Sequence, residues 1–234
     1  MKVSIVISIY NSHGAFARQL AYFKKMNPPN DVEFIFVDDG SDPPLQGEMK
    51  NMRILQTHNN LAWTQGLGRN LGASQARGEY LFMTDLDHII SREALEATRA
   101  FTGNKMIFRR QIALLLSDGT LTQDRKALTE FGYSGERMDA SVHGNTFVMK
   151  KEIFDQLGGY APETCTLGYH PASKKGDDCY FNGKWNRAFA GTAPVLGPDI
   201  YLFPIGRFHD RKELNPGALF HNLSQEKQVS FMKK

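Results

Sequence analysis

Short, continuously apolar segments alternate with helical patterns in the first part of the chain, and this alternation restricts it to few folds. Strands are predicted at residues 3–9, 32–37, 53–57 and 80–84. Apolar residues recur at spacings of four and three within residues 15–26, as on one helix face, and residues 64–76 predict a second helix. Strands that are apolar throughout are typical of parallel sheets covered by helices. The order β-α-β-β-α-β therefore predicts an α/β fold with a mixed, mostly parallel sheet flanked by helices.

The remaining sequence alternates less regularly, and no composition shift divides it into independent domains. Helices are expected over residues 91–101, 151–157 and 177–190, and strands over residues 105–110 and 145–149. Residues 116–137 are compatible with a hairpin or a loop, whereas residues 162–176 have no periodicity and suggest a lid or an acceptor loop. We therefore expect one domain over residues 1–234, with halves at about 1–95 and 96–210 and a tail at 211–234.

Composition narrows the class of protein. With 234 residues and a net charge of +3, the chain is only mildly basic, which does not by itself indicate nucleic-acid binding. Val3–Ile9 is too short for the apolar part of a signal peptide, and no segment approaches the roughly 18–20 apolar residues of a membrane span. Cys165 and Cys179 provide no disulfide framework. We expect a cytoplasmic protein without an integral membrane segment, either free or peripheral to a membrane.

The strand at residues 80–84 is followed directly by Asp85-Leu86-Asp87. In an extended strand, side chains two residues apart point the same way, so both carboxylates are expected on one face. Open α/β sheets bind ligands at the carboxyl ends of their strands. One or two carboxylates there suffice to hold a divalent cation beside phosphate oxygens and water. An isolated Asp-x-Asp pair can equally solvate a turn, so its interpretation depends on the neighbouring motifs.

Three other segments place polar residues at strand ends or in a helix: Ser8-Ile9-Tyr10-Asn11, Val37-Asp38-Asp39-Gly40-Ser41 and Gly68-Arg69-Asn70-Leu71-Gly72-Ala73. Asp-Gly is a favoured turn pair, but two adjacent carboxylates repel each other unless one of them has a donor to bind. Tyr10 is compatible with a ligand site or with core packing, and Arg69 with a site or with exposed surface. Both alternatives stay open for these two residues until the motifs are considered together.

These motifs together resemble the family 2 glycosyltransferases, which have the GT-A fold. The resemblance is dense over about residues 3–90 and resumes at residues 144–160 and 176–185. It depends on an ordered set of short motifs: Asn59-Asn60-Leu61, Gly66-Leu67-Gly68-Arg69-Asn70-Leu71-Gly72, Ala76-Arg77-Gly78-Glu79-Tyr80 and Asp85-Leu86-Asp87. Each motif is weak alone, and their order makes the set specific.

The resemblance implies a nucleotide-sugar donor, with UDP as the expected nucleotide. In the family, the corresponding second aspartate binds the base, a role carried to Asp39, with Ser8 and Tyr10 as its neighbours. The family's Arg-Asn pair faces the nucleotide, which places Arg69 there, and Asp85 would contact the ribose or the donor sugar. The first half would then bind the nucleotide sugar and the second half the acceptor.

The resemblance also implies Mn²⁺ or Mg²⁺, because a divalent cation neutralises the charge that develops on the leaving diphosphate. Asp87 is the expected direct ligand, with Asp85 reaching the metal through water. Many proteins of this fold supply a later histidine, for which His209 is the candidate, although a structural or exposed tail histidine fits equally. His143 stands where the family usually has glycine, which leaves the donor sugar open.

The acidic pair Asp177-Asp178 corresponds to the family's pair that includes the catalytic base. In an inverting transfer, a carboxylate takes the proton of the acceptor hydroxyl as its oxygen attacks the anomeric carbon. Asp178 is the preferred base and Asp177 the second choice, while a helix N-cap is the structural alternative. Tyr180 departs from the family, which often has a third acid at that position.

Two other functions remain open on the sequence alone. The first is a catalytically inactive nucleotide-sugar-binding protein of the same fold, indicated by the missing acid at Tyr180. The second is a nucleotidyltransferase, although the loop Tyr10-Asn11-Ser12-His13-Gly14 lacks the lysine and the glycines that a triphosphate loop usually needs. The acceptor is unknown and is compatible with a saccharide, a glycolipid or a modified DNA base. The oligomeric state is also unknown.

Overall fold

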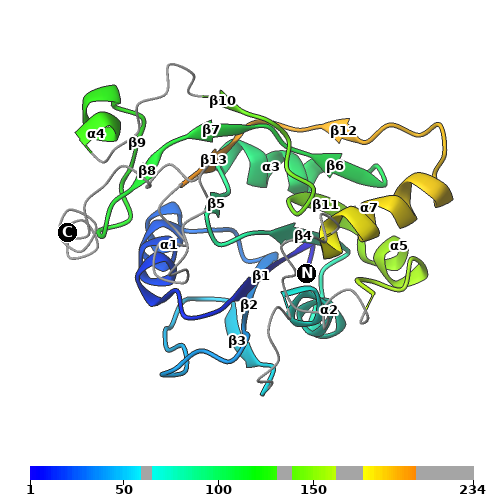
Figure 1. Ribbon diagram of the computed structural model, residues 1–234, viewed down its shortest axis with the longest axis horizontal. Helices are drawn as coiled ribbons and strands as arrows, with labels where there is room; N and C mark the ends of the chain where they lie inside the picture. Colours follow the sequence, from blue (N-terminus) through cyan, green and yellow to red (C-terminus); the bar gives the residue numbers. More distant parts are fainter. Residues whose placement is uncertain (59–64, 131–138, 162–175, 204–234) are drawn as a thin grey trace.

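The structure, a computed structural model, describes residues 1–58, 65–130, 139–161 and 176–203. A seven-stranded sheet has the order β12-β6-β11-β4-β1-β2-β3 (Figure 1). Its strands are β1 (Val3–Ile9), β2 (Val32–Asp38), β3 (Met52–Gln56), β4 (Tyr80–Thr84), β6 (Lys105–Ile107), β11 (Phe147–Lys150) and β12 (Val195–Leu196). β11 is antiparallel to β4 and β6, and the other pairs are parallel. The expected mixed, mostly parallel sheet is confirmed.

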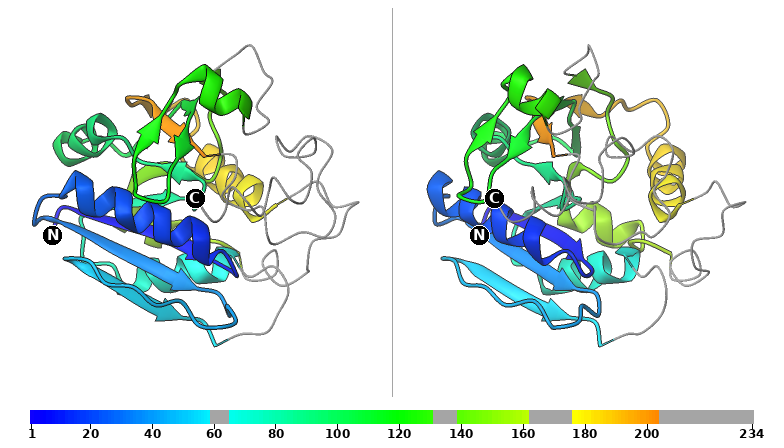
Figure 2. Two further views of the ribbon diagram at one scale, coloured as in Figure 1. Left: turned by 90° about the vertical axis from the view of Figure 1, so that its left-hand side faces the viewer. Right: turned by 60° about the vertical axis from the view of Figure 1, so that its left-hand side comes forward.

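Helices cover both faces of this sheet. α1 (His13–Met26) and α3 (Arg92–Ala100) pack on one face, and α2 (Gln65–Gln75), α5 (Lys151–Gln156) and α7 (Asp177–Ala188) pack on the other. Successive side chains of a strand point to opposite faces, so Ile5 and Ile7 join the core under α1, whereas Val6 joins the core under α2. Figure 2 shows α1 lying along one face of the parallel strands. The domain therefore has three layers, with an apolar core on each side of the sheet.

A smaller sheet with the order β10-β7-β13-β5 lies beside the main one. It contains β5 (His88–Ile89), β7 (Arg110–Ile112), β10 (Asp139–Ala140) and β13 (Ile200–Leu202). A separate hairpin, β8 (Leu114–Leu115) and β9 (Leu121–Thr122), leads to α4 (Arg125–Glu130). The strand expected over residues 105–110 is wrong as one element, because β6 ends at Ile107 in the main sheet and β7 starts at Arg110 in the smaller one.

The antiparallel strand β11 begins at the edge of the sheet where β4 ends, because Phe147 pairs with Met83 and Lys150 with Tyr80. The chain that enters β11 therefore arrives at the carboxyl ends of the parallel strands. Helix α3 begins as expected, since the Ser91 hydroxyl accepts a hydrogen bond from the Ala94 amide at 3.0 Å. None of the described helices combines the length and apolar character needed to cross a bilayer.

Lys105 is a buried cation between the main sheet and α7. Its Nζ donates a hydrogen bond to Asn182 Oδ1 at 2.8 Å and lies 5.1 Å and 5.0 Å from the ring centroids of Phe147 and Trp185. Burial lowers the pKa of Lys105 to about 8, because the ammonium group loses hydration inside the core. Trp185 is itself buried, so it belongs to the core.

This burial predicts a specific pH dependence of stability. Between about pH 8 and 10.5, the unfolded chain keeps a proton on Lys105 that the folded chain has released. Unfolding then takes up a proton, so the free energy of unfolding rises with pH in this window and is unaffected by Lys105 below it. Lys105→Met should remove about 3 kcal/mol of that rise. Urea titrations from pH 7 to 10.5 would measure the free energy of unfolding. Lys24 is exposed, so Lys24→Met is a control that should keep the rise with pH. The same rise in the unmodified chain, Lys105→Met and Lys24→Met would contradict the lowered pKa of Lys105.

Candidate functional site

The parallel strands β1, β2 and β4 end at the same edge of the sheet, with β4 two residues shorter than β1. Ile9 pairs with Asp38, and Ile7 pairs with Thr84, the last residue of β4. The Asp39 amide extends this pairing by donating to the Ile9 carbonyl at 2.7 Å. The residues that follow the three strands, including Asp39 and Asp85, are therefore brought to one edge, as the sequence predicted.

The two adjacent aspartates after β2 have different surroundings. The Asp38 carboxylate accepts hydrogen bonds from the amides of Ser41 and Leu45, both at 2.9 Å, and so closes the loop. Asp39 Oδ1 accepts a hydrogen bond from the Thr57 hydroxyl at 3.0 Å. Each carboxylate thus has its own donors, which relieves the repulsion between them. Asp38 is the structural member of the pair, and Asp39 remains the candidate for ligand binding.

Tyr10 is 54% exposed beyond the end of β1, so the alternative that it packs in the core is wrong. The next residue, Asn11, has φ 45° and donates its amide to the Ser41 hydroxyl at 2.9 Å, which joins this loop to the loop after β2. Ser8 is buried against α2, where a Cβ on Gly68 would lie only 2.6 Å from Ser8 Oγ. Glycine at that position is therefore what lets the helix lie so close to β1.

Asp85 is bound to α2 by two side chains. Arg69 Nη2 donates to Asp85 Oδ1 at 2.5 Å, and Gln65 Nε2 donates to the same oxygen at 2.6 Å. Arg69 is fully buried, so the alternative of an exposed surface arginine is wrong. Burial by itself lowers the pKa of Arg69, but the neighbouring Tyr160 and Asp85 outweigh this effect and raise the pKa above its usual value. The site thus contains a permanent buried cation.

The chain turns immediately after β4, so the expectation that Asp85 and Asp87 extend from one face of a strand is wrong. β4 ends at Thr84, and the His88 amide donates back to the Asp85 carbonyl at 3.1 Å. The Asp87 carbonyl accepts a hydrogen bond from the Phe203 amide at 2.7 Å, next to β13. The charge of the half-buried Asp87 side chain acts on His88. Asp85 and Asp87 therefore belong to one turn but have different neighbours.

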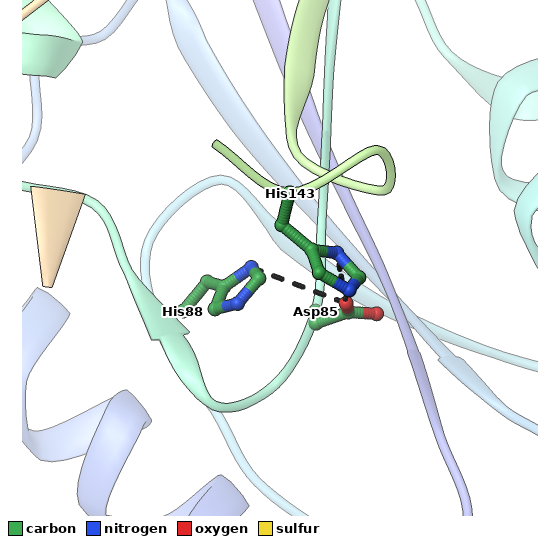
Figure 3. A group of neighbouring side chains, drawn as sticks. All are labelled: Asp85, His88 and His143. Atoms are coloured by element: carbon green, nitrogen blue, oxygen red, sulfur yellow. Dashed lines mark ion pairs between the residues drawn. The ribbon is translucent and has the colours of Figure 1, made fainter. Parts of the chain in front are cut away.

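The turn brings Asp85 together with two histidines (Figure 3). Asp85 Oδ2 lies 3.5 Å from His143 Nδ1 and 3.9 Å from His88 Nδ1. One carboxylate and two imidazoles form a group that could hold a divalent cation. In the sequence, His143 is distinguished only as a departure from glycine, and no motif distinguishes His88. The signal for His88 is its position three residues after Asp85, which a turn brings close.

Hydrogen bonds fix the present orientation of His88. Burial lowers the pKa of His88 to about 4, so its imidazole is neutral at pH 7. Arg110 Nη1 donates to His88 Nε2 at 3.0 Å, which leaves the ring proton on Nδ1, where it is donated to Thr146 Oγ1 at 2.5 Å. Cation binding by His88 Nδ1 requires this proton to leave. His143, which is partly exposed, is thus the more available of the two imidazoles.

The acidic pair begins α7. The N-cap position is Gly176, so neither Asp177 nor Asp178 is the N-cap that the structural alternative required. Asp177 is buried and accepts the Asp178 amide at 2.9 Å, while Asp178 is only partly buried. Asn182 Nδ2 donates to the carbonyls of Gly144 and Asp178 at 3.1 Å and 2.8 Å. These bonds hold the start of α7 against the turn that precedes β11.

The turn at His143-Gly144 connects the donor side to the acidic pair. A Cβ on Gly144 would lie 3.3 Å from Asp178 Oδ2, and His143 Nδ1 lies 3.5 Å from Asp85 Oδ2. Asp85 and Asp178 therefore flank the same two-residue turn. The predicted ligand His209 lies outside the described residues, as does the motif Asn59-Asn60-Leu61.

Comparisons with known proteins define the class. The chain is 15% identical to S. aureus TarS 1–349 in complex with UDP-GlcNAc, with TM-score 0.52, over 96% of this chain and 62% of that one. It is 16% identical to the mannosyltransferase PcManGT of Pyrobaculum calidifontis in complex with GDP-Man and Mn²⁺, with TM-score 0.50, over 86% and 56%. These likenesses show that the fold is the GT-A glycosyltransferase fold.

Sequence comparison points the same way. Residues 4–102 match the sequence model described as glycosyl transferase family 2. The poly(ribitol-phosphate) beta-N-acetylglucosaminyltransferase TarS of Staphylococcus aureus is 32% identical over 108 residues, 43% of this chain. The match spans only 19% of the length of that relative.

Proposed function

We propose that the chain transfers a sugar from a nucleoside-diphosphate donor to an acceptor hydroxyl, with inversion at the anomeric carbon. The first donor candidate is UDP-N-acetylglucosamine, the ligand of the TarS complex to which the fold is similar. The observation that carries the proposal is the His143-Gly144 turn, which contacts Asp85 on one side and adjoins Asp178 on the other. A donor bound at Asp85 would thus present its reactive carbon near the first turn of α7.

The nucleotide would bind at the ends of β1 and β2. Asp39 has one carboxylate oxygen on the Thr57 hydroxyl and would accept hydrogen bonds from the base. The exposed ring of Tyr10, beside it, offers an aromatic face for stacking. Ser8 and Arg69 border this region from β1 and α2, and Arg69 keeps Asp85 oriented toward the ribose or the sugar. Together with Asp85, these four residues are the five positions that the sequence predicted for donor binding.

The residues present fit a divalent cation, with Mn²⁺ or Mg²⁺ as the candidates. Carboxylate oxygens and imidazole nitrogens are suitable ligands. Asp85 and His143 lie close enough to share one cation, and Asp87 would join them as the ligand that the sequence resemblance implies. When bound, the cation would neutralise the charge that develops on the leaving diphosphate. Gln65 and Arg69 would keep Asp85 in place by occupying its Oδ1, so that Oδ2 is directed to the histidine side.

Asp178 would act as the general base. Its carboxylate takes the proton from the acceptor hydroxyl, the hydroxyl oxygen forms the new bond to the anomeric carbon, and the nucleoside diphosphate leaves with the bonding electrons. Asp178 suits this role better than the buried Asp177 because it is the more exposed member of the pair. The acceptor half, residues 96–210, would contribute Asp178 and the turn at His143, and its acceptor class is open.

Calorimetric titration with UDP tests the donor site. We expect binding in the presence of Mn²⁺ and at least about tenfold weaker binding in EDTA, because a cation held by these residues would supply positive charge to the diphosphate. Asp87→Ala should lose this metal dependence, whereas Asp155→Ala, on the exposed surface of α5, should retain it. Folded protein that binds none of UDP, GDP or the other nucleoside diphosphates would refute the proposal. Binding without hydrolysis or transfer would favour the inactive alternative instead.

A further inference from the structure

Arg69 connects two parts of the site through a buried tyrosine. Its Nη2 donates to Asp85 at the end of β4, and its Nη1 donates to the Tyr160 hydroxyl at 3.0 Å. Both Arg69 and Tyr160 are 0% exposed, so water does not compete for these bonds. Losing the Tyr160 hydroxyl would leave one N–H of a buried guanidinium without its acceptor.

Tyr160 is fixed between α2 and α7. Asn70 on α2 binds its backbone on both sides, accepting from the Tyr160 amide at 2.9 Å and donating to its carbonyl at 2.8 Å. The Tyr160 ring stacks on Phe181 of α7, with centroids 4.8 Å apart and an interplanar angle of 26°. One residue therefore contacts the helix that carries Arg69 and the helix that begins with the acidic pair.

Asp177 completes the cluster at the start of α7. Its Oδ2 and Arg69 Nε are both buried, and each has no hydrogen-bond partner among the residues that the structure describes. One is an acceptor and the other a donor. Burial raises the pKa of Asp177, and the charge of Arg69 opposes that shift. The two unpaired atoms are therefore chemically complementary, a buried donor and a buried acceptor.

We propose that Tyr160 and Asp177 are positioning residues that, through Arg69, couple donor occupancy at Asp85 to the orientation of Asp178. The inference rests on the proposed function. A donor that engages Asp85 weakens the hold of this carboxylate on Arg69. The guanidinium charge is then balanced more by Asp177, whose Oδ2 can accept the Nε hydrogen. Because Asp177 immediately precedes Asp178, this contact sets the first turn of α7 in the arrangement needed for proton transfer.

Tyr160→Phe tests the coupling with little change of shape. Its matched control is Tyr80→Phe, which removes another buried hydroxyl, one that donates to the Gly103 carbonyl at 3.1 Å away from Arg69. The measurements are UDP affinity with Mn²⁺ and the kcat and KM of UDP-N-acetylglucosamine hydrolysis, with water as the acceptor. For Tyr160→Phe we expect UDP affinity and KM within about threefold of the unmodified chain and a kcat at least about tenfold lower. Tyr80→Phe should keep kcat within about twofold.

Asp177→Asn and the double variant Tyr160→Phe/Asp177→Asn complete a cycle. If both residues act through Arg69, the double variant should lose little more kcat than the worse single variant, because the two changes are not additive. Two results would overturn the coupling: a loss of kcat in the double variant equal to the product of the two single losses, or the same kcat for Tyr160→Phe and Tyr80→Phe. Either result would leave the proposed function intact, since the unmodified chain would still be active. An unmodified chain that neither binds UDP nor hydrolyses the donor would overturn the proposed function, and the coupling with it.

Discussion

Asp178→Asn is expected to slow sugar transfer about 10²–10⁴-fold, the range typical of losing a general base. The amide cannot accept the proton of the acceptor hydroxyl, but it nearly preserves the size of the side chain. The bonds from Asn182 to the Gly144 and Asp178 carbonyls involve the backbone, so the first turn of α7 should stay in place. UDP affinity should therefore remain within about threefold of that of the unmodified chain, and the substitution should act mainly on kcat.

The measurement is UDP release from UDP-N-acetylglucosamine, first with water and then with candidate acceptors. Asp155→Asn provides a matched control, because Asp155 is an exposed carboxylate on α5 whose partner is Lys151 at 2.7 Å. It should keep full activity. An Asp178→Asn protein as active as this control would show that the base is another group, and the buried Asp177 would be the next residue to test.

Arg69→Met is expected to lower the free energy of unfolding by about 3–5 kcal/mol, the usual cost of breaking a buried ion pair by removing one partner. Methionine fills much of the same space, so the loss comes from charge rather than from a cavity. Asp85 is 2% exposed and would keep Gln65 as a donor but lose its cation. The midpoint of thermal unfolding should fall by roughly 6–20 °C for a chain of this size.

Arg99→Met is the comparison for Arg69→Met. Arg99 pairs with Asp31 at 3.0 Å, but both side chains are partly exposed, and such pairs contribute only about 0–1 kcal/mol. Urea unfolding of both variants would separate the two cases. Equal, small losses would mean that Asp85 is neutralised or solvated without Arg69, which would also undermine the coupling through Tyr160.

Strands β1, β2 and β4 could be predicted closely because each is buried on both faces and consists mostly of apolar residues. Residues 3–9 and 80–84 were predicted with the bounds that the structure has, and residues 32–37 differ by one residue. Strands buried between two helical layers can be recognised from the sequence, because almost every position in them must be apolar. The same regularity made it possible to predict that Asp39 and Asp85 lie at one edge.

The smaller sheet could not be predicted, because its strands are too short to show a repeating pattern of apolar and polar residues. β5 has two residues and pairs with β13, more than a hundred residues later in the chain. That distant partner, rather than local propensity, makes the chain turn after Asp85 and directs His88 inward. The burial of Arg69 could likewise not be predicted from the neighbouring sequence, because it depends on contacts with Tyr160 and Asp85, which lie elsewhere in the chain.

The antiparallel β11 has a consequence for how the site can change. The sheet register of β11 is set by its pairing with β4 and β6, starting at Phe147. The turn before it lies outside that register. A Cβ on Gly144 would lie only 2.8 Å from Asn182 Nδ2, whereas the partly exposed side chain of His143 can vary at little cost to folding. If the chain transfers sugars as proposed, substitution at this one partly exposed position would alter the site and leave both cores and the sheet untouched.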